Sequence, residues 1–524
     1  GKPLTQFVDQ RDQVLSALVE TAKHKTFYKD PNVEIFLDLR RTRMVFRFEH
    51  ALAGAMGISA TLTVSNSVLI PAQSSSFQIT VSNRGTEAVR VQVSGPEAGR
   101  IDQAIALSSK PGAKTDVPPG QVRTIPLTYN VPEKMMLTVP HAVHLYDEGF
   151  AGRLVYVTVF VEPVDPRLPF TPYSRVGRFP ITAYHRFDVT PPVEIANIRP
   201  TPFVLTSHTA EVKNFDNALT LSLLNHTNAA FTGTLLTTIA GASDPLAVNL
   251  SPREREDISV TSRRLFPDPP QVTNGDGDAH RSIDFALRSS GKATIASATI
   301  PAVPVNASVV PNLLIGYIRG FDFSLPNALN ALGVESKELS VDEVKTADLA
   351  KFTSVIVDNR VYESKPELIA VNQKLLDYTN AGGTLIVFYH KSDEWNPDPR
   401  RNRPQLAPYK LLLGNERITD ENAPIAFIEP QHPLLNIPNK IGPDDFKDWI
   451  QERGLYYPRE WDPQFHALLQ SNDPGETPLK GGLLVADYGK GHYIYTSMVW
   501  YRQLRAGVPG AYRMLANMIS YGRH

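Results

Sequence analysis

The sequence predicts a multidomain protein in which a helical segment and two β-sandwiches precede an α/β domain with a parallel sheet. Three observations carry this prediction. The chain has 524 residues, enough for three or four domains. From Ile58 to about Pro304, apolar and polar residues alternate with a period of two, which is typical of half-buried strands. From residue 311 onward, short apolar runs alternate with helical patterns, which is typical of parallel sheets.

The best-defined unit of the α/β domain runs from Ser354 to His390. Its first apolar run, Ser354–Asn359, predicts a strand. Pro366–Gly383 has apolar residues at helical spacing, a proline in the first turn and two glycines at the end, so it predicts a helix. Thr384–His390 predicts a second buried strand. Together they predict a right-handed βαβ unit, and ligands collect at the carboxyl ends of such strands.

The remaining domains follow from changes in pattern along the chain. Two amphipathic stretches near the start predict a helical tether. The strand spacing in the two β-rich regions is typical of immunoglobulin-like sandwiches. Both regions contain a strand, an Asn-containing turn and a strand, which suggests two copies of one module. The predicted boundaries are 1–57 for the helical tether, 58–163 for sandwich one, 164–190 for a Pro-rich linker, 191–310 for sandwich two and 311–524 for the α/β domain.

The composition excludes several classes of protein. The 53 Lys and Arg balance 54 Asp and Glu, so nothing indicates a nucleic-acid or membrane-surface binder. The sequence has no run of about 18 apolar residues, so it predicts no transmembrane helix. The first residues lack the basic start and apolar core of a signal peptide. The chain has no cysteine, which removes disulfides and thiolate metal sites and fits an extracytoplasmic (periplasmic or secreted) protein, although a cytoplasmic one is not forbidden.

The order of strands and helices from Leu313 resembles the class I glutamine amidotransferase-like, flavodoxin-like fold. In that fold the nucleophilic cysteine lies at the turn after the last strand of the βαβ unit. This chain has Tyr389-His390-Lys391 at that turn. A glutaminase that acts through a thiolate is therefore excluded.

A candidate ligand cleft lies at the carboxyl edge of the predicted sheet. Aromatic platforms beside carboxylates and amides suit sugars, because sugar C–H faces stack on rings and hydroxyl groups need polar partners. The alternative is that the arginines and carboxylates form ion pairs that hold long loops above an apolar floor of tryptophans. The candidate residues are Asp358, Arg360, Tyr362, His390, Asp393, Glu394, Trp395, Trp449, Glu452, Arg453 and Trp461.

A catalytic pair is a further hypothesis for this edge. His390 and Glu394 have the chemistry of a base and the residue that orients it. The chain has no serine in a Gly-x-Ser-x-Gly turn, and a lone histidine at a strand end is more often structural. We therefore favour the structural interpretation.

Two histidine and aspartate clusters invite a metal hypothesis. In Asn274–His280, Asp276 and Asp278 have the alternate spacing of calcium ligands, but the EF-hand pattern is missing and Asn-Gly and Asp-Gly are strong hairpin-turn signals. We favour the turn. His141 and His144 lie in a strand-like context that places them on opposite faces, which argues against a shared metal.

Several stretches resemble the carboxy-terminal half of long bacterial PIG-L (LmbE-like) deacetylase family proteins. They include RVYESKPELIAVNQKLLDYTNAGGTLIVFYH, HPLLNIPNKIGPDDFKDWIQERGLYYPREWDPQF and DPGETPLKGGLLVADYGKGHYIYT. The resemblance is strong over 311–524 and mainly architectural over 1–310. It implies a secreted zinc-dependent N-acetylglucosaminyl deacetylase domain, then sandwich modules, then an amidotransferase-like domain without its nucleophile.

The zinc site of that family is missing from this chain. The family's motif is of the Ala-His-Pro-Asp-Asp type with a distant histidine, which suits zinc and a catalytic base. Here His432-Pro433 is followed by two leucines, and Asp444-Asp445 is preceded by Gly442-Pro443. No zinc ligand can be carried over. We expect no cofactor in this chain and zinc only in an upstream catalytic domain.

The leading hypothesis is a non-catalytic accessory region that binds glycan, cell-envelope material or a protein partner for an attached or associated deacetylase. One alternative is a fragment of an active zinc-dependent N-deacetylase whose catalytic domain lies upstream of Gly1. Another is a structural subunit of a surface assembly, with contacts made by the sandwiches and the tether.

Overall fold

The computed structural model describes residues 47, 49–98, 112–138, 153–164, 179–206, 218–239, 242–261 and 281–523. Most of the predicted tether lies outside these residues. Residues 49–55 are helical, and Leu52 and Ala53 belong to the core of the first sandwich. The chain divides into two compact units, Gly1–Glu194 with Leu224–Ala230 and Ser251–Glu254, and Ile195–Leu223 with Phe231–Leu250 and Arg255–His524.

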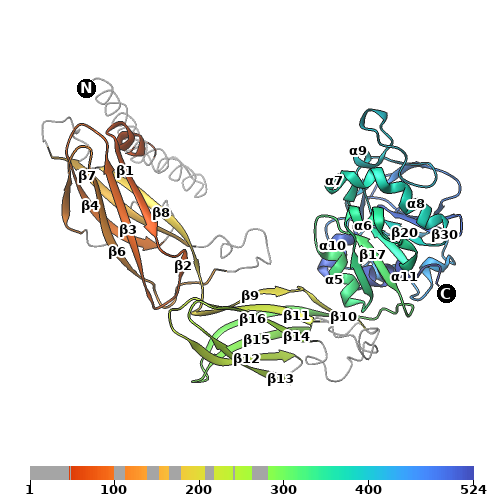
Figure 1. Cartoon of the computed structure of the whole chain (residues 1–524), viewed down its shortest axis with the longest axis horizontal. Coiled ribbons are helices and arrows are strands. Elements are labelled where there is room, and N and C mark those ends of the chain that lie inside the picture. The colour runs from red at the N-terminus through yellow and green to blue at the C-terminus, as the bar shows by residue number, and fades with distance from the viewer. Residues whose placement is uncertain are drawn as a thin grey trace. The chain divides into compact units, whose positions relative to one another are not determined.

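The first β-sandwich consists of a three-stranded and a five-stranded sheet around one core (Figure 1). The three-stranded sheet has the order β1 (Ile58–Val64), β3 (Ser74–Asn83), β6 (Val122–Asn130). The five-stranded sheet has the order β2 (Val68–Leu69), β8 (Phe179–Val189), β7 (Arg153–Pro163), β4 (Val89–Ala98), β5 (Lys114–Val117). The alternation of buried and exposed residues in the sequence therefore corresponds to the inner and outer faces of real strands.

Strand β8 corrects the predicted linker over 164–190. Residues 179–189 are not a connection, because they pair antiparallel with β7 from Arg153↔Phe187 to Val161↔Phe179. Within this proline- and aromatic-rich stretch, Phe179, Ile181, Ala183, Phe187 and Val189 are all buried. The proline- and aromatic-rich composition indicated a linker, whereas the alternation of apolar and polar residues over 179–189 predicts a strand.

The second sandwich has the same plan within the part of the chain described. One sheet has the order β10 (Phe203–Thr206), β16 (Thr294–Val305), β15 (Arg281–Ser289), β12 (Phe231–Ile239), β13 (Ala242–Leu250). The other has the order β14 (Arg255–Thr261), β11 (Ala218–Asn225), β9 (Val193–Arg199).

Residues 311–523 are built around a seven-stranded mixed sheet. Its first five strands run parallel, whereas β29 and β26 are antiparallel to their neighbours. The order is β18 (Glu335–Glu338), β17 (Leu314–Ile318), β19 (Ser354–Val357), β20 (Thr384–Val387), β30 (Gly491–Thr496), β29 (Leu483–Tyr488), β26 (His466–Ala467). The predicted βαβ unit is present, with β19 and β20 as parallel neighbours and a helix between them.

Helices and small sheets complete this region. The α-helices are α5 (Ser324–Ala331), α6 (Val341–Thr346), α7 (Val361–Ser364), α8 (Asn372–Asn380), α9 (Ser392–Trp395), α10 (Trp500–Ala506) and α11 (Pro509–Ser520). Three small sheets pair β21 (Leu411–Leu413) with β25 (Pro458–Trp461), β22 (Arg417–Ile418) with β24 (Gly454–Leu455), and β23 (Ala426–Phe427) with β27 (Leu469–Ser471) and β28 (Leu479–Lys480). No helix among the described residues has the length and apolar character needed to cross a membrane.

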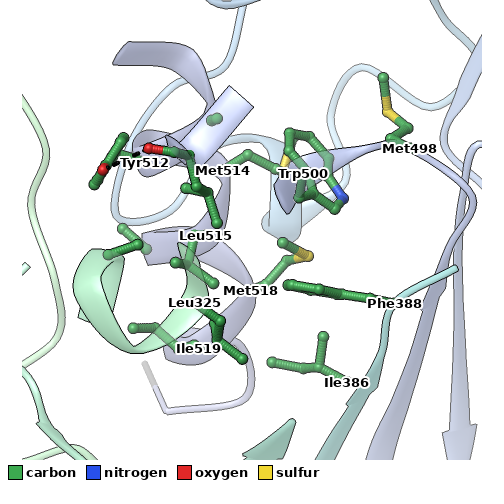
Figure 2. Close-up of a cluster of buried hydrophobic side chains, with 14 of the residues drawn as sticks. Leu325, Ile386, Phe388, Met498, Trp500, Tyr512, Met514, Leu515, Met518 and Ile519 are labelled. Carbon is green, nitrogen blue, oxygen red and sulfur yellow. Dashed lines mark hydrogen bonds between the residues drawn. The ribbon is translucent and has the colours of Figure 1, made fainter. Parts of the chain in front are cut away.

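Two apolar cores cover the opposite faces of the seven-stranded sheet. Val355 and Val357 of β19 belong to one core, which also contains residues of α8, whereas Ile356 belongs to the other. Figure 2 shows this second core, where Ile386 and Phe388 meet side chains from α5 and α11. A sheet that is buried on both faces leaves its strand ends as the places where polar side chains can gather.

Substitution of Leu515 in α11 tests how much this core contributes to the free energy of unfolding. Leu515→Ala removes an apolar side chain that is 1% exposed, and we expect it to lower the free energy of unfolding by about 2–5 kcal/mol. Ile428→Ala is the control, because Ile428 is 38% exposed and its loss should cost less than about 1 kcal/mol. All four tryptophans lie between residues 395 and 500, so tryptophan fluorescence in urea reports this region alone. Equal losses in the two variants would contradict the prediction.

Candidate functional site

The carboxyl ends of the parallel strands lie at one edge of the sheet, and they bring together loops that are far apart in sequence. Strands β17, β19, β20 and β30 end at Ile318, Val357, Val387 and Thr496. The residues that follow each strand therefore form a common surface, here called the carboxyl edge.

Asp358 lies at the centre of the carboxyl edge and is buried. Its Oδ2 accepts a hydrogen bond from the Gly320 N–H at 2.9 Å, and its Oδ1 accepts one from the Asn359 N–H at 2.8 Å. Burial raises the pKa of Asp358 to about 7, against the opposing effect of these two hydrogen bonds. Asp358 thus ties the loop after β17 to the end of β19.

His390 is also buried, and both of its ring nitrogens are occupied. Nδ1 lies 2.8 Å from the Phe388 carbonyl oxygen, and Nε2 accepts a hydrogen bond from the Tyr362 N–H at 3.3 Å. Burial lowers the pKa of His390 to about 3, so the ring is neutral near pH 7 with its proton on Nδ1. Neither nitrogen is available to activate a nucleophile.

Tyr362 and Trp395 pack against His390 and hold the insertion that follows it. The Tyr362 and His390 ring centroids are 4.9 Å apart, and those of His390 and Trp395 are 5.6 Å apart. The Tyr362 hydroxyl donates to Asn372 Oδ1, and the Trp395 indole N–H donates to the Leu411 carbonyl at 3.0 Å. Both rings are buried, so neither can serve as an open stacking platform for a sugar.

Arg360 reaches solvent from this part of the edge. Its Nη2 forms ion pairs with Glu394, at 2.9 Å, and with Glu363. Its guanidinium carbon lies 5.3 Å from the ring centroid of Phe321, which follows β17. The positive charge of Arg360 is therefore balanced by carboxylates.

Trp449, Glu452 and Arg453 gather near α10. Trp449 is buried against Trp500, with ring centroids 5.2 Å apart, so it is not an open platform either. Arg453 donates from Nε to the Ala423 carbonyl at 3.0 Å and lies over the Trp449 ring. These contacts fit the loop-holding interpretation of Arg453.

A stack of three tyrosines, none of them among the predicted candidates, connects the group around His390 with the group around Trp449. Tyr389 stacks on Tyr456, with centroids 6.5 Å apart, and on Tyr501, with centroids 5.9 Å apart. Burial raises the pKa of Tyr389 above its ordinary range. Arg502 lies over Tyr501 and forms an ion pair with Glu452 at 2.9 Å.

Three buried polar atoms at the carboxyl edge lack a hydrogen-bond partner among the described residues. They are Asn359 Oδ1, an acceptor, Arg502 Nε, a donor, and Ser497 Oγ, which can do both. An unpaired buried polar group costs about 1–3 kcal/mol, so such atoms are often completed by a ligand or water.

The remaining candidates are not brought into this cluster. Asp393 is exposed on α9, and Trp461 is half-buried in β25 opposite Leu411. Asp276, Asp278, His141 and His144 lie outside the described residues. Among the residues that are described, no group of three or more histidines and carboxylates is arranged to hold a metal ion.

Some of the residues that were missed lie just after a strand end, as the predicted candidates do. Tyr501 and Arg502 come soon after β30, which was predicted only as half of a terminal hairpin and not as a parallel neighbour of β20. Tyr456 has no comparable signal, because it lies in an irregular loop with a φ of 52°.

Comparisons with known proteins add no family. No family model and no curated protein matches the chain. Among solved structures, red sea bream transglutaminase is similar at 10% identity and a TM-score of 0.23. The match covers 49% of this chain and 33% of the transglutaminase chain. A GH2 β-galacturonidase from Eisenbergiella tayi, bound to galacturonate, is similar at 9% identity and a TM-score of 0.22, covering 60% of this chain and 64% of the enzyme. A bacterial ice-binding adhesin is similar at 12% identity and a TM-score of 0.16, covering 49% of this chain and 67% of the adhesin. These likenesses are too distant to assign a function.

Asp358→Asn tests the buried carboxyl group. Because its folded pKa of about 7 is above the ordinary value of 3.8, its contribution to stability is present at low pH and is lost as the pH rises through about 7. We expect the difference in unfolding free energy, wild type minus variant, to fall by up to about 1.4 kcal/mol per pH unit between about pH 5 and 7. Urea unfolding followed by tryptophan fluorescence measures it, and a difference independent of pH would contradict the assignment.

His390→Asn tests a contribution to stability that changes with pH in the opposite direction from that of Asp358. The folded pKa of about 3 is below the ordinary 6.5, so the contribution of His390 to stability is present above about pH 6.5 and is lost on acidification. We expect the wild-type minus variant difference to shrink as the pH falls from about 6.5 to about 4. Asn retains an N–H that can donate to the Phe388 carbonyl, which favours folding of the variant. A difference that grows on acidification would overturn the neutral, buried histidine.

Proposed function

We propose that this chain is a non-catalytic accessory region of a PIG-L family type protein and that it binds an uncharged glycan at the carboxyl edge. In this proposal residues 311–524 are a flavodoxin-like, amidotransferase-like domain without its nucleophile. The parallel order β18-β17-β19-β20 and the place of Tyr389-His390 at the end of β20 support this assignment. The partner activity would be a zinc-dependent N-deacetylase, attached upstream or associated, in an extracytoplasmic setting.

The observation that carries the proposal is the combination of stacked tyrosines with an unpaired donor and an unpaired acceptor. A hydroxyl group both donates and accepts, so a sugar that displaces the side chains over the buried Arg502 Nε and Asn359 Oδ1 can satisfy both atoms with the same kind of group. The half-buried Tyr456 and Tyr501 offer ring edges and faces for sugar C–H groups.

The charges at the carboxyl edge favour a neutral ligand. Arg360 is paired with Glu394 and Glu363, and Arg502 is paired with Glu452. An anionic ligand would have to displace these carboxylates, and a cationic one would have to displace the arginines. An uncharged oligosaccharide requires neither.

Binding of the tetramer of N-acetylglucosamine tests the proposal. We expect saturable binding by calorimetry, with little change in affinity between low and high salt because the ligand is uncharged. Tyr501→Ala should weaken binding at least about fivefold, because it removes one stacking surface.

Tyr184→Ala is the matched control. Tyr184 is an exposed tyrosine of β8 in the first sandwich, and its loss should leave the affinity unchanged. Urea unfolding by tryptophan fluorescence confirms that Tyr501→Ala is folded. Absence of saturable binding at millimolar tetramer, or equal affinities of both variants, would refute glycan binding at this edge.

A further inference from the structure

A small pocket lies between α5, α10, α11 and the turn that precedes β10, apart from the stacked tyrosines. Its volume is about 120 Å³, and all of its lining residues belong to one compact unit of the chain. The walls are mixed, with slightly more apolar than polar surface, and the apolar part includes Pro200, Pro202, Phe323, Leu504 and Tyr512.

Ser324 gives this pocket an unsatisfied polar group. Its residue is 6% exposed, it lines the pocket, and its Oγ has no hydrogen-bond partner among the described residues. Its backbone N–H already donates to Asp322 Oδ1 at 2.8 Å. The hydroxyl is therefore buried and unpaired, and a carbonyl oxygen of a bound group would satisfy it.

Two exposed phenylalanines lie on the loop after β17, and one of them lines the pocket. Phe323, which lines it, is 61% exposed, and Phe321 is 57% exposed. The guanidinium carbon of Arg319 lies 4.4 Å from the Phe323 centroid, so the ring is held in place although it faces water. Exposed aromatic rings beside arginines are typical of the centres of protein interfaces.

The charges around the pocket are balanced. Arg319 pairs with Glu338 at 3.0 Å, and Arg505, which lines the pocket, pairs with Asp322. The occupant therefore need not be charged.

The size of the pocket selects the occupant. An apolar cavity of about 150 Å³ holds a benzene molecule, so about 120 Å³ suits one compact side chain and is small for a pyranose ring with its hydroxyl groups. Aromatic walls combined with a donor for a backbone carbonyl are the features by which grooves bind proline-rich segments. We propose that this pocket binds a prolyl side chain of an extended, uncharged segment of a partner protein, with the adjacent carbonyl accepting from Ser324 Oγ.

The probe for this site is acetyl-triproline amide, with acetyl-triglycine amide as the comparison. Saturation-transfer NMR on the full chain should show saturable binding of the proline peptide in about the millimolar range, as expected for one filled pocket. Asn327, exposed at the pocket, offers a blocking variant that leaves the core intact. Asn327→Trp should weaken binding at least about tenfold, and Ser324→Ala should weaken it about fivefold because one hydrogen bond is lost.

Asn330→Trp is the matched control, because Asn330 is exposed on the same helix and does not line the pocket. Its affinity should stay within twofold of wild type, roughly the change expected from a remote surface substitution. Equal binding of the glycine peptide, unchanged binding by Asn327→Trp, or competition by the N-acetylglucosamine tetramer would each overturn the assignment. Retained peptide binding in Tyr501→Ala separates this site from the proposed glycan site.

Discussion

The buried carboxylate of Asp358 is the contact on which the carboxyl edge depends. It accepts from the Gly320 and Asn359 N–H groups and so joins the loop after β17 to the end of β19. Gly320 is required at this contact, because a Cβ there would lie 2.5 Å from the Asn359 carbonyl oxygen. The same loop carries Phe321, next to Arg360, and Phe323, which lines the small pocket. Both proposed sites therefore depend on one buried acid and one glycine.

The turn after β20 is held by a structural contact through His390. Phe388 and Tyr362 use both ring nitrogens of His390, and Trp395 covers the ring. Freeing a nitrogen for catalysis would leave a buried carbonyl or N–H unpaired, which costs about 1–3 kcal/mol before any chemistry begins. The hydrogen bonds that stabilise this turn therefore also prevent His390 from acting as a base.

The local pattern of apolar residues predicted some parts of this molecule and could not predict others. The βαβ unit over Ser354–His390 could be predicted because its strands are continuously apolar and its helix has clear end signals. The expectation that polar residues gather just after strand ends placed Asp358, Arg360 and His390 at the carboxyl edge, because it depends only on where strands stop. It could not distinguish buried tryptophans from open ones, since the partner of Trp395 is the carbonyl of Leu411, in the short strand β21. Tyr456 and Tyr501 meet Tyr389 only through pairing between distant strands, which no local window contains.

The two sandwiches provide independent evidence that buried polar groups define this chain's turns. Asn83 is fully buried, and its side-chain N–H groups donate to the Glu87 and Val117 carbonyls at 2.8 Å, while its Oδ1 accepts from the Gly85 N–H.

Asn225 repeats this pattern in the second sandwich. It donates to the Ala229 and Ser251 carbonyls and accepts from the Thr227 N–H. In both turns the side chain reaches a carbonyl four residues ahead and an N–H two residues ahead. An unpaired buried amide is costly, and each turn satisfies its amide with the same set of two carbonyls and one N–H. The shared hydrogen bonds therefore favour two copies of one module more strongly than the weak sequence similarity does.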